Sequence, residues 1–284
     1  MSEIIISCDS SCDLSKELIE RYNIKVSPFS VLLGDKQYHD GVDITPDDIY
    51  EYHKKTGNLA RTAAINMQES LEFFNSVRTD DTPIIFITIS QKMSGTYQYA
   101  SLAAKELKNV FVVDGENLST GGGHLVIKAA ELAKSGKTPE EIVEILNETK
   151  KRVNASFVID SLEYLRKGGR CSTLASLGAN LLKLKPCIEV RHGEMSVGKK
   201  YRGNFANVLK EYTAAVLADK DNIELHRVFI THAGANEKLV NDIAEQVKNS
   251  LPFKEVLITR AGATVSVHCG ANTLGVLFIQ KTAL

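Results

Sequence analysis

The stretch that decides the fold is residues 83–100, which read PIIFITISQKMSGTYQYA. Its first part, residues 84–89, is apolar and rich in β-branched side chains, which predicts a strand buried on both faces. Polar residues and a glycine follow at once, and Tyr97 and Ala100 then stand at the spacing of a helix. A buried strand that leads directly into a helix is typical of a parallel α/β sheet.

The junction between this strand and this helix has the chemistry of an anion site. Ser94, Gly95 and Thr96 stand where the first backbone N–H groups of the helix are free and the helix dipole is positive. The junction also follows the carboxyl end of a strand, where open α/β sheets bind ligands. An equally good interpretation is that these residues only cap the helix.

The composition is that of an ordinary globular protein. The chain has 284 residues, 43% of them hydrophobic and 24% charged, and its net charge is -1. That charge implies no general attraction to nucleic acid or to anionic membranes. No apolar run approaches the roughly 20 residues that span a bilayer, and the N-terminus shows no signal-peptide pattern. We therefore expect a cytoplasmic protein with no integral membrane segment.

The residue types that bind metals are present but not in metal-binding patterns. The five cysteines are scattered, which predicts buried free thiols rather than a zinc site. The acidic residues at positions 40, 43, 47 and 48 lack the alternating pattern of a calcium loop. We expect no metal site.

The order of the predicted elements divides the chain into two α/β domains. Residues 1–154 alternate strand and helix, which predicts a mainly parallel sheet. In residues 155–284 the link His192-Gly193 is too short for a crossover, which predicts a mixed, partly antiparallel sheet. We expect the ligand cleft between the two domains.

Several local predictions accompany this division. Thr62 is expected in a short connection ahead of a helix, and Ser119 within a loop. The other predictions are a single strand over residues 26–33, a loop over residues 115–123, a helix over residues 175–182, and a loop or short element over residues 265–270.

Catalysis by Ser94 with a distant histidine is the main alternative to simple binding. His232 and His268 both follow apolar runs and precede small residues, although a histidine in that position is more often structural. No Gly-x-Ser-x-Gly context supports a serine hydrolase. Binding of another anionic small molecule, such as a phosphorylated metabolite, is a third hypothesis.

Eight blocks of sequence, taken together and in order, resemble the DegV family of bacterial fatty-acid-binding proteins. The most specific block is LEYLRKGGR at residues 162–170. The other blocks are DSSCDL at 9–14, DGVDI at 40–44, ISQKMSGTYQ at 89–98, VD at 113–114 with STGGG at 119–123, KP at 185–186, HAG at 232–234, and HCG at 268–270 with LGV at 274–276.

The resemblance implies one unit over about residues 3–282, with a lipid tunnel between two α/β domains. The tunnel would hold a long-chain fatty acid such as palmitate or oleate, and the protein would need no cofactor and catalyse nothing itself. It would present the carboxylate to a partner fatty acid kinase, which makes the acyl phosphate, as a part of lipid transport and fatty acid metabolism. The alternative remains a serine-dependent acyl hydrolase or transferase that uses Ser94 and His268.

The resemblance also implies roles for individual residues. On the family pattern, Thr62, Ser94 and His268 bind the carboxylate together with the helix start at Gly95. Arg170 is implied to contact the kinase, whereas its position at a helix end is equally typical of a cation that stabilises the helix dipole.

One departure from the family pattern lies next to Thr62. The family usually has Thr-Ser-Gln-Pro-Ser there, but here Ala63 and Ala64 follow the threonine. The sequence therefore leaves open the geometry of this loop and the preferred length and saturation of the acyl chain.

Overall fold

The structure, a computed structural model, describes residues 3–171 and 184–283. The first sheet has the strand order β2-β1-β6-β7, and all its strands are parallel, as the sequence predicts. Its strands are β1 (Ile5–Asp9), β2 (Lys25–Ser27), β6 (Ile84–Thr88) and β7 (Val110–Asp114). The central strand β6 is the predicted apolar strand, and all its residues are buried.

Alternate residues of β6 pack against helices on opposite faces of the first sheet. Ile84 and Phe86 pack into the apolar core on one face of the sheet, which one pair of helices covers. Ile85 and Ile87 pack into the apolar core on the opposite face, which a second pair of helices covers. The first pair of helices is α3 (Met67–Val77) and α4 (Thr96–Lys105), and the second is α5 (Ser119–Lys134) and α6 (Pro139–Thr149). The short helix α1 (Lys16–Arg21) precedes β2. This two-sided cover explains why β6 is an unbroken apolar run.

The second sheet is mixed, as predicted. Its strand order is β10-β9-β8-β13-β11-β12, and only β11 and β12 pair in parallel. The strands are β8 (Val153–Ile159), β9 (Leu184–Arg191), β10 (Glu194–Arg202), β11 (Ile223–Ala233), β12 (Glu255–Arg260) and β13 (Thr273–Gln280). The domain division expected from the sequence, between residues 154 and 155, falls near the start of β8 and inside this strand.

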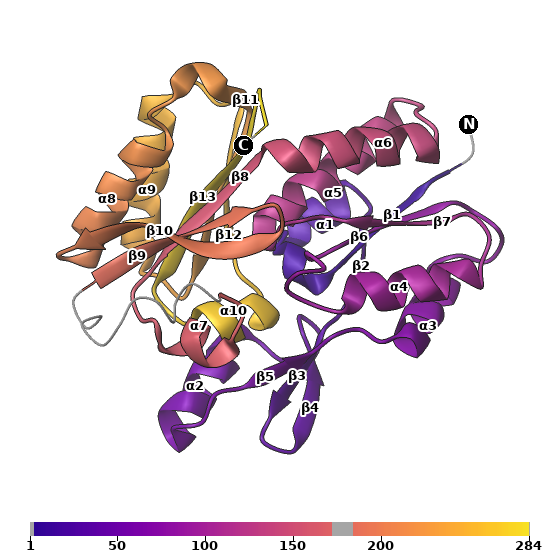
Figure 1. Ribbon diagram of the computed structural model, residues 1–284, viewed down its shortest axis with the longest axis horizontal. Coiled ribbons are helices and arrows are strands. Elements are labelled where there is room, and N and C mark those ends of the chain that lie inside the picture. Colours follow the sequence, from indigo (N-terminus) through magenta and orange to yellow (C-terminus); the bar gives the residue numbers. More distant parts are fainter. Residues whose placement is uncertain (1–2, 172–183, 284) are drawn as a thin grey trace.

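Helix α5 lies between the two sheets and joins their cores. Helices α8 (Phe205–Val216) and α9 (Glu237–Ser250) cover the far face of the second sheet (Figure 1). On the near face, Phe229 and Leu277 belong to the same apolar core as Ile85 and Leu125. None of the helices described combines the length and the apolar character needed to cross a bilayer.

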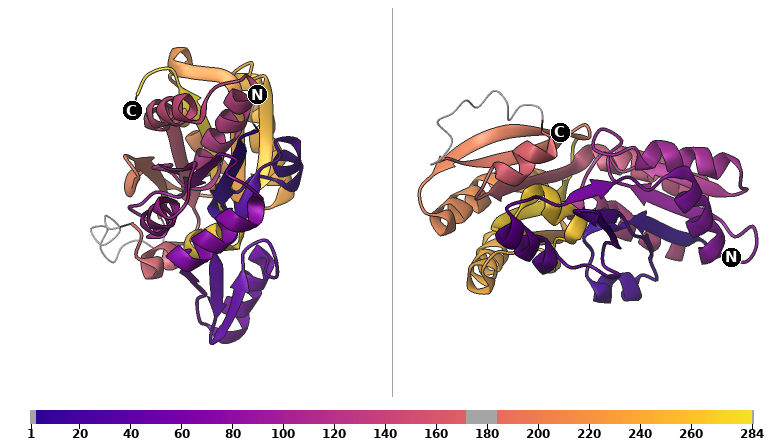
Figure 2. Two further views of the ribbon diagram at one scale, coloured as in Figure 1. Left: turned by 90° about the vertical axis from the view of Figure 1, so that its right-hand side faces the viewer. Right: turned by 90° about the horizontal axis from the view of Figure 1, so that it is seen from below.

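A third sheet of order β4-β3-β5 corrects the prediction of one strand over residues 26–33. That stretch is divided between β2 of the first sheet and β3 (Ser30–Leu33), because Pro28 between them has no N–H to donate to a ladder. A turn at Gly34 joins β3 to β4 (Lys36–His39), and this hairpin projects from the body (Figure 2). The third strand, β5 (Arg61–Ala63), contains Thr62, which the sequence places in a connection.

Three short helices meet where the two parts of the chain come together. They are α2 (Pro46–Thr56), α7 (Glu163–Gly168) and α10 (Ala263–Cys269), and α10 packs against both others. The stretch predicted as a loop or short element at residues 265–270 is thus mostly helical. The helix predicted over residues 175–182 lies outside the described residues.

The loop predicted over residues 115–123 ends earlier than expected. Residues from Ser119 onward form the first turn of α5. Gly123 in this turn allows close packing, since a Cβ there would lie 2.8 Å from the side chain of Leu14 and 3.0 Å from the carbonyl oxygen of Cys12.

Candidate functional site

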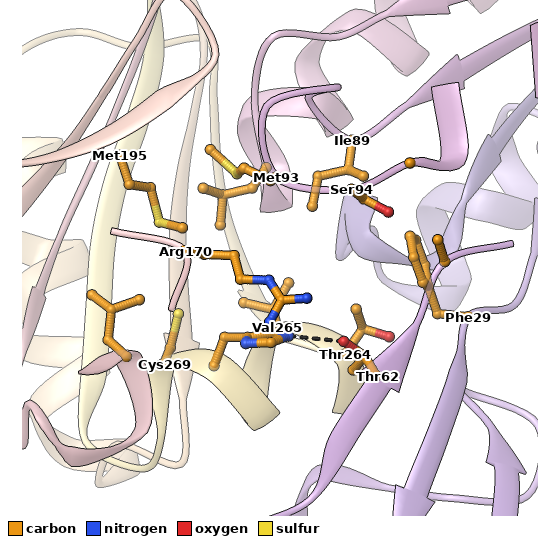
Figure 3. Close-up of a pocket in the computed structure, with 15 residues that line it drawn as sticks. Phe29, Thr62, Ile89, Met93, Ser94, Arg170, Met195, Thr264, Val265 and Cys269 are labelled. Carbon is orange, nitrogen blue, oxygen red and sulfur yellow. Dashed lines mark hydrogen bonds between the residues drawn. The ribbon is translucent and has the colours of Figure 1, made fainter. Parts of the chain in front are cut away.

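A cavity of about 180 Å³ lies where the two parts of the chain meet (Figure 3). The residues around it come from both parts, from Phe29 to Leu118 and from Leu165 to Cys269. Most of the lining is apolar, and its polar side chains are Thr62, Ser94, Arg170, Thr264 and His268.

The structure brings all five site residues of the sequence analysis to this one cavity. Thr62, Ser94, Gly95, Arg170 and His268 all line it, although they come from separate elements spread over more than two hundred positions. Figure 3 shows the side chain of Arg170 extending into the cavity.

Thr62 and His268 are joined across the two parts of the chain. Thr62 lies in β5, and its Oγ1 is 2.9 Å from Nε2 of His268 in the last turn of α10. The other ring nitrogen, Nδ1, has no hydrogen-bond partner among residues 3–171 and 184–283. It faces Gly168, where a Cβ would stand only 2.7 Å away, so the ring occupies space that only a glycine leaves open.

His268 is a neutral donor or acceptor at neutral pH. Burial, with a smaller contribution from the positive charge of Arg170, lowers the pKa of His268 to about 4. An arriving carboxylate therefore meets an uncharged imidazole that can offer one N–H. The permanent positive charge at the cavity belongs to the exposed side chain of Arg170.

Ser94 precedes the start of α4 and lines the cavity. Its Oγ accepts a hydrogen bond from the backbone N–H of Thr96 at 3.3 Å and lies 3.0 Å from Oγ1 of Thr96. Thr96 Oγ1 in turn accepts from the N–H of Ile65 at 3.2 Å, which ties this loop to the segment after β5. The N-cap residue of α4 is Gly95, so Ser94 does not cap the helix with its side chain but forms a turn at its start, and the same residue lines the cavity.

Sequence reasoning missed Thr264, a further polar residue of the cavity. Its Oγ1 is buried and has no hydrogen-bond partner within the described part of the chain. No motif marks this threonine, because only the folding of α10 turns it toward the cavity. The apolar residues Phe29, Met93 and Met195 were also not predicted, since they meet only in the tertiary structure.

The apolar lining continues beyond the first cavity. A second cavity of about 30 Å³ shares Leu118, Val265 and Cys269 with it. This deeper cavity is lined by side chains of the second sheet, among them Phe157 and Leu277. The two cavities thus follow one another toward the apolar core. We call the polar side chains of the first cavity the polar group; they are Thr62, Ser94, Arg170, Thr264 and His268.

The serine and the histidine that line the cavity are each hydrogen-bonded to a threonine. Nε2 of His268 is hydrogen-bonded with Thr62, and Oγ of Ser94 is hydrogen-bonded with Thr96, so the serine and the histidine each have another partner. Within the described residues no group of three or more His, Cys, Asp or Glu side chains is placed to bind a metal ion.

A family described as "Uncharacterised protein, DegV family" matches residues 3–281 of the chain. The chain belongs to the DegV family. A DegV domain-containing protein of Clostridium perfringens is 32% identical over 286 residues, covering 99% of this chain and 100% of the relative. A second relative, from Caldanaerobacter subterraneus, is 32% identical over 285 residues with the same coverage.

Solved structures of DegV proteins share this fold. A fatty-acid-binding DegV family protein from Thermus thermophilus has a TM-score of 0.90 at 28% identity, covering 99% of this chain and 100% of that one. DegV of Bacillus subtilis, described as a fatty acid binding protein, has a TM-score of 0.86 at 28% identity with the same coverage. A stearic-acid-binding protein from Eubacterium ventriosum has a TM-score of 0.84 at 26% identity, covering 99% of each chain. The resemblance to the DegV family and the expected α/β fold, with a parallel first sheet and a mixed second sheet, are both confirmed.

Proposed function

We propose that this DegV chain binds a long-chain fatty acid such as palmitate or oleate in a buried tunnel. The carboxylate binds at the polar group, and the acyl chain follows the two apolar cavities toward the second sheet. The observation that carries the proposal is the cavity itself, which has hydroxyls and an imidazole at one end and leads to a second cavity with a mostly apolar surface. Relatives that are described as fatty-acid-binding and share the fold support it.

The polar group can hold a carboxylate without a dedicated buried cation. Ser94, Thr62 and Thr264 supply hydroxyl donors, neutral His268 supplies an N–H, and Arg170 supplies a charge near the opening. Thr264 is the strongest addition to the expected set, because a buried hydroxyl with no partner in the described structure costs free energy until a ligand satisfies it.

The acyl chain supplies most of the affinity. Burial of a C16 chain contributes on the order of 10 kcal/mol at ~0.8 kcal/mol per CH₂. Loss of translational freedom and ordering of the chain then offset part of this gain. A bound fatty acid is therefore expected to survive purification.

We also propose that the protein presents the carboxylate to a fatty acid kinase for acyl-phosphate formation. Arg170 is exposed, lines the cavity, and follows the basic end of α7, where Arg166 and Lys167 are also exposed. It is thus placed to contact a partner that reaches the carboxylate. The ATP that such a kinase consumes is consistent with a cytoplasmic location.

Titration of delipidated protein with oleate and palmitate tests the binding function. We expect saturation at one fatty acid per chain for at least one of the two acids. Acyl-phosphate production by a fatty acid kinase and ATP, dependent on the loaded protein, tests presentation. Turnover of an acyl ester that is lost in Ser94→Ala, without stoichiometric binding of free acid, would instead establish the hydrolase alternative.

A further inference from the structure

The two acidic motifs near the N-terminus, DSSCDL and DGVDI, have no role in the cavity lining. They contain Asp9, Asp13 and Asp40, whose side chains are only 1%, 5% and 5% exposed. Burial raises the pKa of Asp9 to about 6 and that of Asp13 to about 8, so ionisation is costly at both positions. Buried carboxyl groups persist only where donors surround them.

The donors of two of these acids are the first backbone amides of α10. Asp13 Oδ1 accepts from the N–H of Gly262 at 2.7 Å. The two oxygens of Asp40 accept from Ala263 at 2.8 Å and from Thr264 at 3.1 Å. The residue before α10 is Gly262, which has no side chain to cap the helix itself. The start of this helix is therefore held by aspartates more than two hundred positions earlier in the chain.

The two acidic motifs are hydrogen-bonded to each other and to the end of the strand before Ser94. Ser10 Oγ donates to Asp40 Oδ2 at 2.9 Å. Asp9 Oδ2 accepts from the N–H of Ile89 at 2.7 Å, just before the loop that carries Ser94. The motifs thus link the loop of Ser94 to the helix of His268.

Helix α10 needs this support. It has seven residues and carries His268 in its last turn, and helices of that length are not stable by themselves. Because α10 makes only about two turns, a change at its start is expected to reach the residues in its last turn. The position of His268 opposite Thr62 is then set by the carboxylates at the other end of the helix.

We propose that Asp40 and Asp13 are positioning residues that hold His268 in its carboxylate-binding place through the N-terminal amides of α10. This inference rests on the proposed function, since it concerns the binding of the same carboxylate. It assigns a purpose to both acidic motifs, and it predicts that Asp40 affects ligand affinity through α10, which carries both Thr264 and His268.

A pair of matched variants tests this coupling. Asp40→Ala removes two acceptors from the start of α10, and loss of a helix cap shifts a local equilibrium by about fivefold or more, so we expect oleate affinity to fall by that factor. Asp47→Ala is the control, because Asp47 makes an exposed ion pair with Arg260, just before the same helix. Exposed ion pairs contribute little, so this variant is expected to bind oleate as the parent does.

The decisive measurement is a double-mutant cycle with His268→Ala. If Asp40 acts through His268, Asp40→Ala has a smaller effect on oleate affinity in the His268→Ala background than in the parent, and what remains is the part that acts through Thr264. An effect of the same size in both backgrounds overturns the proposal. Asp40→Asn keeps one carbonyl acceptor and should give an intermediate affinity, and it replaces Asp40→Ala in the cycle if the alanine variant does not fold.

A measurement without ligand separates this proposal from the proposed function. In fatty-acid-free protein, the ring resonances of His268 should shift in Asp40→Ala or Asp40→Asn and remain unchanged in Asp47→Ala. Unchanged His268 resonances in the Asp40 variants overturn the positioning role. Failure of the parent protein to bind oleate would refute the binding function and leave the resonance test valid.

Discussion

Replacement of Ser94 by alanine is the sharpest single test of the carboxylate site. The hydroxyl lines the cavity and stands 3.0 Å from Oγ1 of Thr96. A hydrogen bond to a charged group contributes about 1.5–3 kcal/mol, so its loss predicts a decrease in affinity of roughly 10- to 150-fold. The apolar lining of the cavity is unchanged, so we expect binding to be weakened and not abolished.

The same substitution has a smaller effect on the fold. It removes the acceptor of the Thr96 N–H, and loss of one such hydrogen bond costs about 1 kcal/mol of the free energy of unfolding. Thr96 keeps its own hydrogen bond from Ile65. We therefore expect a folded variant with a slightly lower melting temperature.

Calorimetric titration of delipidated protein with oleate measures the affinity, and thermal unfolding measures the stability. Ser101→Ala is a matched control, because Ser101 lies in the same helix but outside the cavity lining. An Ser94→Ala affinity equal to that of the parent, with the fold intact, would refute the assignment of the carboxylate to this loop.

Three further predictions concern the histidines and their surroundings. Gly168→Ala places a Cβ 2.7 Å from Nδ1 of His268 and should weaken oleate binding. Gly122→Ala is the control: a Cβ there has no neighbouring atom within 4 Å, so this variant should stabilise α5 by up to about 1 kcal/mol and leave oleate binding unchanged. Equal oleate affinities of the two variants would contradict this prediction. Arg170→Ala should raise the pKa of His268 in an NMR titration, because the arginine charge lowers it, and an unchanged pKa would be evidence against their contact. Burial lowers the pKa of His124 to about 4, so neutral His124 contributes up to about 3 kcal/mol to the free energy of unfolding above pH ~6.5, and this contribution is lost as the pH falls toward 4. Between about pH 7 and about pH 4.5, His124→Gln should therefore lose less free energy of unfolding than the parent. Equal losses in the two proteins would contradict the assignment.

The parts of the site that follow from local sequence were predictable. The apolar run before Ser94 identifies a buried strand by composition alone, and the residues at its end must then face the carboxyl edge of the sheet. The link His192-Gly193 in the same way fixes an antiparallel pair, because no crossover fits between the two strands. Such features depend only on residues that are neighbours in the chain.

The remaining parts depend on contacts between distant residues. The strand of Thr62 has three residues and pairs only with β3, so no periodic pattern marks it. Helix α10 follows Gly262, which has no side chain to cap it, and the distant Asp13 and Asp40 accept from the N–H groups at its start instead. The start of this helix is therefore not visible in the local sequence. Thr264 follows from the same cause, since it lines the cavity only once this helix is in place.

The central claim is that the cavity holds one long-chain fatty acid. Native mass spectrometry of the freshly purified protein tests it most directly, followed by extraction and identification of any bound lipid. The account predicts a mass increment that corresponds to one long-chain fatty acid per chain, which organic extraction removes and added oleate or palmitate restores. A protein that carries no lipid, and whose mass does not change with either acid, would contradict it.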